Sequence, residues 1–426
     1  MRGLVLEALQ SLHRHRETIA GYVRVAREHG DLRLCILTRE GVRETLPYSD
    51  LPPEIELLEE VPDYFIPGAL ERRAMSLLTE RPCDAIFAPR EDDIIRAARL
   101  RELFDIPGQS VESARAYRDK WQMKSRVARA GVPVWPSTRV NDAVDFWAAL
   151  ERFGVPCVLK PRSDRLTRHV EFIRDPADAL AAYQRSIQRV PLDAPLRYVL
   201  EPYADRRLCH SDGVWHDGRL YCNIASEYIG ATSARPSMGA PFGSVTLDPA
   251  SERAGRIRRS VEDVIRALPS SHTFLFHAEL WEDETGELCL NEIASRPGGR
   301  FIASNTLNAT GAEPDSLWLA LVCGLDPRRI GYVGESEFRP SASVALPYRS
   351  GRVRALPERC ELDFVVSYKP AESITVGTVL PPQRVWWDTL GDVTLIPPSH
   401  ADLPTAVDRL LDWARAEIVI EDEVPA

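Results

Sequence analysis

The first hundred residues alternate short, almost wholly apolar runs with longer stretches in which apolar residues recur every few positions. A short apolar run bounded by polar residues is typical of a buried strand, whereas recurrence at helical spacing indicates a helix. Their order predicts a β-α-β start and a small parallel α/β domain over residues 1–112. The expected elements are strands over residues 3–8, 32–38 and 84–88 and helices reaching about residue 29 and spanning 92–104.

A turn signal at residues 106–110 ends this pattern, and a helix carrying Lys120 and Lys124 is expected to follow as far as Gly131. Later strands have the density of antiparallel sheets packed against helices, which predicts an α+β region over residues 113–330. These strands are expected at 157–160, 198–201, 219–224, 274–281 and 288–293, followed by helices over 314–324 and 403–416. The predicted domains are residues 1–112, 113–195, 196–330 and 331–426.

Composition argues against several classes of protein. The 426 residues are 44% hydrophobic and 27% charged, as in ordinary globular proteins. The longest apolar run, Leu317 to Leu325, is well short of the roughly 20 residues that cross a bilayer, and the N-terminus lacks the apolar core of a secretion signal. We therefore expect a cytoplasmic protein without membrane contact. A net charge of -10 disfavours nucleic acid as a partner, and eight scattered cysteines without a CxxC pair predict reduced, mostly buried thiols.

Two glutamates mark the strongest candidate site. Residues 274–281 and 288–293 read as the two strands of a β-hairpin, and Glu279 and Glu292 are expected to project from the same face of it. Mg²⁺ prefers hard oxygen ligands and is commonly bound by one or two carboxylates together with substrate phosphates. The pair therefore predicts a magnesium site, with Mn²⁺ as an alternative ion. Ordinary solvated surface acids are the competing interpretation.

The residues around Glu292 carry a further pattern. The chain reads Asn-Glu-Ile-Ala-Ser-Arg-Pro-Gly-Gly over residues 291–299, so an arginine follows the acid by four positions and paired glycines come next. This stretch resembles the signature of the ATP-grasp superfamily, and its Asn-Glu-Ile-Ala form is similar to that of ATP-grasp purine-biosynthesis carboxylases. The resemblance implies that Arg296 and the backbone N–H of Gly299 bind the substrate carboxylate and later the oxyanion.

Three earlier segments resemble the other ATP contacts of this family, in the family's order. Residues 118–136 resemble its helix and turn with a first ATP lysine, residues 156–161 its strand with a second, and residues 198–204 the hinge that offers backbone groups to adenine. A lysine that ends a buried strand also needs a charged partner, and a nucleotide phosphate would serve. The nucleotide contacts implied by the resemblance are Lys120, Lys160, Glu201, Tyr203 and Ala204.

The sequence departs from the family pattern near the ribose and at the metal. An acid is often found where Leu208 stands, which leaves the ribose contact open. Ala294 replaces an asparagine that often helps to ligate metal. Asn291, Ser295 or water would then supply that ligand, or the two glutamates hold the ion alone.

Two segments are expected to line the nucleotide or the substrate. Residues 162–170 lack the family's glycines and carry three arginines, which either clasp phosphates as charged forks or form a solvated basic loop. Residues 227–243 are rich in glycine and small polar residues and lie between the hinge and the hairpin, so they are expected to line the substrate pocket. The three arginines are Arg162, Arg165 and Arg168.

The resemblance as a whole implies an ATP-grasp carboxylate–amine ligase similar to amino-acid ligases. It implies an α/β N-terminal domain, an α+β ATP-grasp fold of two subdomains that clasp ATP, and a small C-terminal α+β lid. Such an enzyme uses ATP and Mg²⁺ to activate a carboxylate, here an amino acid or peptide-like acid of natural-product biosynthesis, as an acyl phosphate. It then transfers the acyl group to an amine, forming an amide and releasing ADP.

Several alternatives stay open at this point. A carboxylase that forms carboxyphosphate would depend on bicarbonate, and a nucleotide-binding protein without turnover would release no ADP. A carrier-protein thiol is a further candidate acceptor. The sequence does not identify the acid or the acceptor among small molecules, and it leaves a homodimer open.

Overall fold

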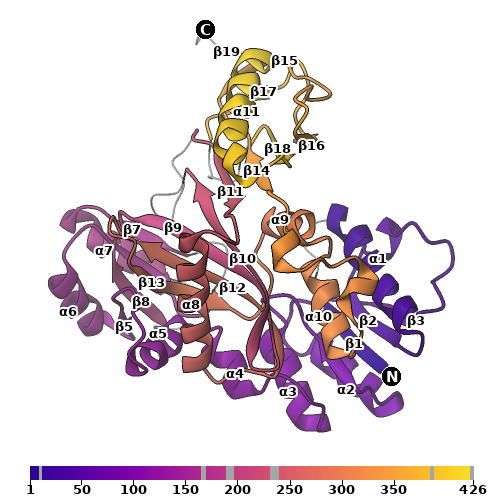
Figure 1. Cartoon of the computed structure of the whole chain (residues 1–426). Coiled ribbons are helices and arrows are strands. Elements are labelled where there is room, and N and C mark those ends of the chain that lie inside the picture. Colours follow the sequence, from indigo (N-terminus) through magenta and orange to yellow (C-terminus); the bar gives the residue numbers. More distant parts are fainter. Residues whose placement is uncertain (9–11, 165–168, 189–195, 231–238, 384–387, 423–426) are drawn as a thin grey trace.

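The computed structural model describes the whole chain except residues 9–11, 165–168, 189–195, 231–238, 384–387 and 423–426. Three units surround a long central sheet in Figure 1: an N-terminal α/β unit on one side, a small sheet on the other, and a C-terminal unit above. No described helix is long and apolar enough to cross a membrane.

The N-terminal unit is a four-stranded parallel sheet in the order β3-β2-β1-β4, which confirms the predicted parallel α/β start. Its inner strands are almost wholly buried, as expected when helices cover both faces of a parallel sheet. Helix α2 and strand β3 were not predicted. Strand β3 contains several acids and lacks the continuous apolar run that is typical of a buried strand. The elements are β1 (Arg2–Glu7), α1 (Leu12–His29), β2 (Arg33–Arg39), β3 (Ile55–Val61), α2 (Ala69–Glu80), β4 (Ala85–Phe87) and α3 (Ile94–Phe104).

Two short helices, α4 (Val111–Ala116) and α5 (Lys120–Arg129), occupy the stretch where the sequence indicated one. Asp119 is the N-cap of the second helix, and its carboxylate accepts hydrogen bonds from the backbone N–H groups of Trp121 at 3.0 Å and Gln122 at 3.1 Å. An aspartate in this capping position satisfies amide groups that have no partner inside the helix. The cap therefore fixes where the turn carrying Lys120 starts.

A small sheet with the strand order β5-β8-β6-β7 follows, and all its pairs are antiparallel. Two helices pack against it around a core that includes Phe146, Leu159 and Leu200. The elements are β5 (Thr138–Val140), α6 (Ala143–Phe153), β6 (Cys157–Pro161), β7 (Glu171–Ile173), α7 (Ala179–Ile187) and β8 (Tyr198–Pro202).

The central sheet has eight strands in the order β13-β12-β9-β10-β11-β14-β18-β16. Strand β9 was not predicted, because its polar and glycine residues hide the strand pattern although nearly all of them are buried. Its elements up to the C-terminal unit are β9 (Arg207–His216), β10 (Arg219–Ile229), β11 (Phe242–Thr246), α8 (Glu252–Ala267), β12 (Thr273–Glu282), β13 (Leu288–Ala294), α9 (Ile302–Thr310) and α10 (Pro314–Val322).

The C-terminal unit continues this sheet, since β14 pairs with β11 and is followed by β18 and β16. A second, three-stranded sheet (β17-β15-β19) and helix α11, close to its predicted bounds, complete it. The elements are β14 (Ala342–Ala345), β15 (Gly351–Ala355), β16 (Val365–Pro370), β17 (Val379–Leu380), β18 (Gly391–Leu395), α11 (Leu403–Glu417) and β19 (Val419–Glu421), and five short 3-10 helices are η1 (Arg43–Thr45), η2 (Pro176–Asp178), η3 (Pro327–Ile330), η4 (Glu335–Glu337) and η5 (His400–Asp402).

The hydrophobic cores cross the predicted domain limits. One core joins Val5 and Leu34 of the N-terminal sheet with Leu275 of the central sheet and Leu317 of α10. The sheet itself crosses the limit at residue 330, so the domain boundaries stay a prediction. Burial of apolar area at about 25 cal/mol per Å² stabilises such a seam, and the units on its two sides are therefore held together by the same core.

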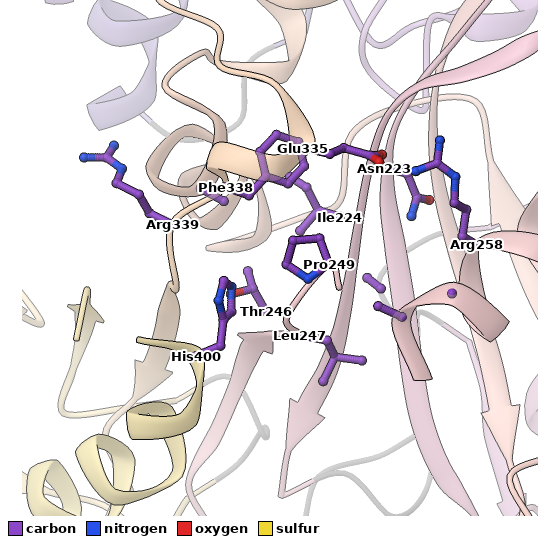
Figure 2. A pocket seen from close by; sticks show the side chains of 14 residues that line it. Asn223, Ile224, Thr246, Leu247, Pro249, Arg258, Glu335, Phe338, Arg339 and His400 are labelled. Atoms are coloured by element: carbon purple, nitrogen blue, oxygen red, sulfur yellow. Dashed lines mark hydrogen bonds and ion pairs between the residues drawn. The ribbon is translucent and has the colours of Figure 1, made fainter. Parts of the chain in front are cut away.

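A small cavity lies where the central sheet, α8 and the C-terminal unit meet. Figure 2 shows its labelled side chains, among them Arg258, Glu335 and His400. Its volume is about 30 Å³, which holds about one water molecule and no substrate. The eight cysteines are all free thiols, five of them buried, as the sequence predicted.

Candidate active site

The two predicted metal ligands are direct cross-strand partners, Glu279 on β12 and Glu292 on β13. Directly opposed residues of an antiparallel pair project from one face of the sheet, so the predicted hairpin geometry is confirmed. The register then shifts, because Leu280 pairs with Leu290 and leaves Asn291 as the extra residue of a β-bulge. A bulge redirects a side chain, and the Asn291 amide donates to Glu279 at 3.0 Å. Asn291 thus joins the two glutamates.

Three lysines gather around two carboxylates beside this hairpin. The ammonium of Lys120 lies 3.1 Å from Glu292, while those of Lys160 and Lys124 lie 2.7 Å and 2.5 Å from Glu201. The sequence predicted a nucleotide phosphate as the partner that the buried ammonium group of Lys160 needs, and the structure corrects this inference. The partner is Glu201 on the neighbouring strand β8, so the burial of Lys160 does not by itself require a phosphate.

The pKa values of the two lysines on Glu201 shift in opposite directions. Burial lowers the pKa of Lys124 to about 8 in spite of Glu201. Burial would also lower the pKa of Lys160, but Glu201 and Glu292 outweigh it and raise that pKa. Burial alone would raise the pKa of Glu292, yet the ammonium groups of Lys120 and Lys160 lower it to about 2. The carboxylate facing the lysines is therefore ionised at neutral pH.

Arg296 lies in a buried chain of charged groups. Its Nε donates to Glu91 from the loop before α3, and Arg118 donates to the other oxygen of the same carboxylate. Burial alone would raise the pKa of Glu91, but Arg296 and Arg118 outweigh it and lower the pKa to about 2. Nη1 of Arg296 donates to the backbone oxygen of Pro297 at 2.7 Å. The ion pair of Arg296 with Glu91 is thus largely shielded from solvent.

Asp212 on β9 organises the loop that follows Arg296. One of its oxygens accepts from the backbone N–H of Gly298 at 3.1 Å and lies 2.9 Å from Nδ1 of His277, and the other lies 2.6 Å from Nδ1 of His210. A Cβ at residue 298 would lie 2.6 Å from the Asp212 carboxylate, so this close approach requires glycine. Burial would lower the pKa of His277, but Asp212 raises it to about 10.

The residues around the hairpin fit a magnesium ion better than the Asp212 cluster does. Glu279, Glu292 and the amide oxygen of Asn291 form a set of hard oxygen ligands, which Mg²⁺ prefers. His210, Asp212 and His277 lie close enough together to hold a metal, but the imidazoles already bond to Asp212. The raised pKa of His277 also favours the imidazolium, which has no lone pair for a metal.

The remaining departures from the family pattern have local explanations. Leu208 packs with Ala204 and Trp281 in a small apolar cluster, so an apolar contact stands where an acid was expected. The hydroxyl of Ser295 donates to Gln109 at 3.3 Å, whereas the Asn291 side chain contacts Glu279. Of the two side chains considered as substitutes for the asparagine expected at Ala294, Asn291 is therefore the one that lies at the glutamates.

Some polar groups of the hinge, residues 198–204, already have partners within the protein. The N–H of Tyr203 donates to the carbonyl of Pro156 at 3.0 Å, and the carboxylate of Glu201 faces the lysines. A nucleotide contact by either residue would therefore use the remaining backbone groups. Arg162 forms a two-pronged pair with Asp119, whereas Arg165, Arg168 and residues 231–238 of the expected substrate loop lie outside the described residues.

Sequence reasoning missed several residues of this site. These residues are Glu91, Lys124, Asp212 and His277. Their partners lie far away in the sequence: Asp212 and His277 are 65 positions apart, and Glu91 and Arg296 are 205 positions apart. The spacing of the residues therefore gives no sign of the pairing. The usable signal was burial: an acid or lysine inside an apolar pattern needs a charged partner. Applied to Lys124 and Glu201 together, this rule would have paired them.

Comparisons with known proteins define the class of fold. No family model matches the chain. An L-amino acid ligase from Bacillus licheniformis has a TM-score of 0.69 at 17% sequence identity, covering 99% of both chains. N5-carboxyaminoimidazole synthase from Aspergillus clavatus, solved with ADP and 5-aminoimidazole ribonucleotide, has a TM-score of 0.65 at 16% identity and covers 97% of this chain and 98% of that one. The chain therefore has the mixed α/β fold of these two enzymes, in agreement with the fold class that the sequence predicted.

A comparison of sequences also finds a similarity to an amino-acid ligase. The L-arginine-specific L-amino acid ligase of Bacillus subtilis is 24% identical over 259 residues, or 60% of this chain and 61% of that enzyme. The matched region thus spans about three fifths of that curated relative. This chain is similar to amino-acid ligases in sequence as well as in fold.

Proposed function

We propose that this protein is an ATP-dependent, ADP-forming ligase that activates a carboxylate as an acyl phosphate and joins it to an amine. The observation that carries the proposal is the face shared by Glu279, Asn291 and Glu292 with Lys120 and Lys160 directly beside it. Oxygen ligands for a divalent cation and ammonium groups for phosphates are what phosphoryl transfer requires.

In this proposal Glu279, Glu292 and Asn291 hold Mg²⁺, which would neutralise charge on the ATP phosphates. Lys120 and Lys160 bind the same phosphates, and Glu201 fixes the direction of Lys160. The backbone of residues 201–204 meets adenine next to the apolar cluster of Leu208. Phosphoryl transfer needs little covalent help from protein, so alignment and electrostatic stabilisation supply most of the rate enhancement.

Arg296 is assigned to the acid substrate. The described residues use its Nε and Nη1, so Nη2 is the atom proposed to bind the substrate carboxylate and then the oxyanion, together with the N–H of Gly299. Glu91 and Arg118 orient the guanidinium from behind. Asp212 orients the glycine turn by its bond to Gly298.

The substrates proposed are small molecules, an amino acid or peptide-like acid and an amine, in natural-product biosynthesis. Support comes from the likeness to an L-arginine-specific L-amino acid ligase. The small sheet and the central sheet are proposed to clasp ATP as two subdomains (Figure 1), with residues 331–426 as a lid. A homodimer and a carrier-protein acceptor stay open within this proposal.

The test is a phosphate-release screen with ATP and Mg²⁺ over amino acids, singly and in pairs, with mass detection of the product. A condensed product with one ADP and one phosphate per bond is expected. AMP as the stoichiometric product would contradict the acyl-phosphate mechanism. Phosphate release that requires only bicarbonate would favour the carboxylase, and the absence of nucleotide turnover with every pair would contradict the proposed activity.

A further inference from the structure

A cavity of about 520 Å³ lies outside the proposed active site, between the N-terminal unit and the edge of the small sheet. This volume is in the range of small-molecule sites. Among the described residues, four arginines line it, together with one acidic residue, Asp119. None of the residues assigned above to ATP, Mg²⁺ or the carboxylate is among its lining residues. The lining arginines are Arg115, Arg118, Arg162 and Arg197.

The walls of this cavity come from two units. Arg115 and Arg118 belong to the α4–α5 region, whereas Arg162 follows β6 and Arg197 precedes β8. Strands β6 and β8 are antiparallel, so the end of one and the start of the other meet at the same edge of the small sheet. Figure 1 shows α5 next to this sheet, with α4 between α5 and α3. Arginines from three separate stretches of the sequence thus bring positive charge to one cavity.

A seam separates the cavity from the lysines of the active site. The backbone N–H of Lys120 donates to the carbonyl of Arg162 at 2.8 Å, and the Arg162 guanidinium makes two bonds to Asp119, at 3.0 Å and 2.5 Å. The side chain of Lys120 leaves this seam toward Glu292. Arg162 and Asp119 therefore form a wall, with the phosphate-binding lysines beyond it.

The charge of the cavity is not neutralised within the described chain. Asp119 balances Arg162 and Glu91 balances Arg118, but Arg115 and Arg197 have no acidic partner among the described residues. Guanidinium groups bind phosphate through paired N–H donors, and two of them on opposite walls suit a ligand with more than one negative charge. We propose that this cavity is a second anion site, which binds a small phosphate-bearing ligand between the α4–α5 region and the small sheet.

The site also contacts the proposed catalytic arginine through one intermediate. Arg118 lines the cavity and shares the carboxylate of Glu91 with Arg296. A ligand that draws Arg118 toward the cavity would change the charge that Glu91 presents to Arg296. Occupancy would therefore alter the affinity for the acid substrate as well as the spacing of the two units.

The test uses pyrophosphate as the probe and isothermal titration calorimetry on the full chain at low ionic strength. The cavity variant is Arg115→Ala/Arg197→Ala, and both positions are exposed, so folding should be preserved. The matched control is Arg139→Ala/Arg174→Ala, which removes two exposed arginines from the same small-sheet region. Lys120→Ala reports on binding at the proposed nucleotide site instead.

Saturable binding that weakens at least about tenfold in the cavity variant, and less than twofold in the control and in Lys120→Ala, is expected. An equal loss in the control variant would mean non-specific attraction and would overturn the site. A loss in Lys120→Ala alone would place the probe among the active-site lysines, and undetectable binding by the wild-type chain would also overturn the proposal. None of these results depends on ligase turnover, so a failure of the proposed function is recorded separately.

Discussion

Two buried charged clusters lie on neighbouring parts of the molecule and solve the same problem differently. In the lysine cluster, Lys124 and Lys160 share one carboxylate, Glu201, which joins α5 to two strands of the small sheet. In the aspartate cluster, two histidines and a backbone N–H surround Asp212, and the second ring nitrogen of His277 lies 3.6 Å from Glu279. One cluster joins separate elements across a boundary, whereas the other holds a loop against its own sheet.

The difference is one of surplus charge. Two ammonium groups on one carboxylate leave a net positive charge, which suits a neighbouring anion such as a phosphate. The carboxylate of Asp212 already has the two imidazoles and the N–H of Gly298 as partners, so it does not attract a further anion. Its bond to Gly298 orients the glycine turn. Buried ion pairs add little net stability, but removing one partner is costly because the other charge is left buried. Each cluster is therefore more informative when it is broken than when it is counted.

The largest effect on stability is expected from Glu201→Gln. The amide keeps the shape but leaves two buried ammonium groups without a carboxylate, which should lower the free energy of unfolding by about 3 to 5 kcal/mol. Urea denaturation followed by circular dichroism measures it. Glu59→Gln is the matched control, because its pair with Arg73 is about one-third exposed and worth about 0 to 1 kcal/mol. Equal losses in the two variants would show that the cluster is not special.

The largest effect on turnover is expected from Glu292→Gln. The change removes a charge that the proposed metal site needs and should lower kcat by on the order of 10² or more. Lys120 lies at the same carboxylate but is partly exposed, so the free energy of unfolding should change far less than in Glu201→Gln. Phosphate release and urea denaturation on the same preparation separate these effects. Normal turnover would leave Glu292 as a partner of Lys120 only.

The sequence predicted the elements with clear periodicity and the hairpin that carries the two glutamates. It failed where burial is achieved by tertiary pairing. The strand that carries Asp212 has a polar sequence, yet nearly all of it is buried. It can be buried because β12 and the glycine loop, both remote in sequence, supply hydrogen-bond partners for Asp212. The bulge that turns Asn291 toward Glu279 is likewise a property of strand register, which a single sequence does not display.

Arg296→Lys tests whether the arginine is merely half of an ion pair. Lysine keeps the charge toward Glu91 but lacks the planar fork needed to hold Glu91 and a substrate carboxylate together. We expect turnover to fall by about 10² to 10³, as for loss of one oxyanion donor, while ATP affinity changes little. Nucleotide titration and phosphate release provide the two readouts. A variant with wild-type turnover would give Arg296 a structural role through Glu91 and leave the acid without a partner.

The smallest effect, a dependence of stability on pH, separates the clusters by sign. The pKa of Lys124 is lowered from 10.5 to about 8, so the folded chain holds fewer protons there, and this group makes stability rise with pH between about 8 and 10.5. The pKa of His277 is raised from 6.5 to about 10, so its contribution is complete below about 6.5 and falls as pH rises toward 10. The two contributions oppose each other above pH 8, but only that of His277 changes between about 6.5 and 8.

Of Lys124 and His277, only His277 changes the free energy of unfolding between pH 6.5 and 8, so measurements in this window report on the aspartate cluster. Asp212→Asn removes the larger of the two charges that raise the pKa of His277, the other being Glu279 at 3.6 Å, and it should reduce a decline of at most about 1.4 kcal/mol per pH unit. Lys124→Met should leave that decline intact and remove the rise at higher pH. Urea midpoints and slopes of metal-free protein at a series of pH values measure both. If the stability of Asp212→Asn declined as steeply as that of the wild type, the charge of Asp212 would not be what raises the pKa of His277, and Asp212 would act only through Gly298 and His210.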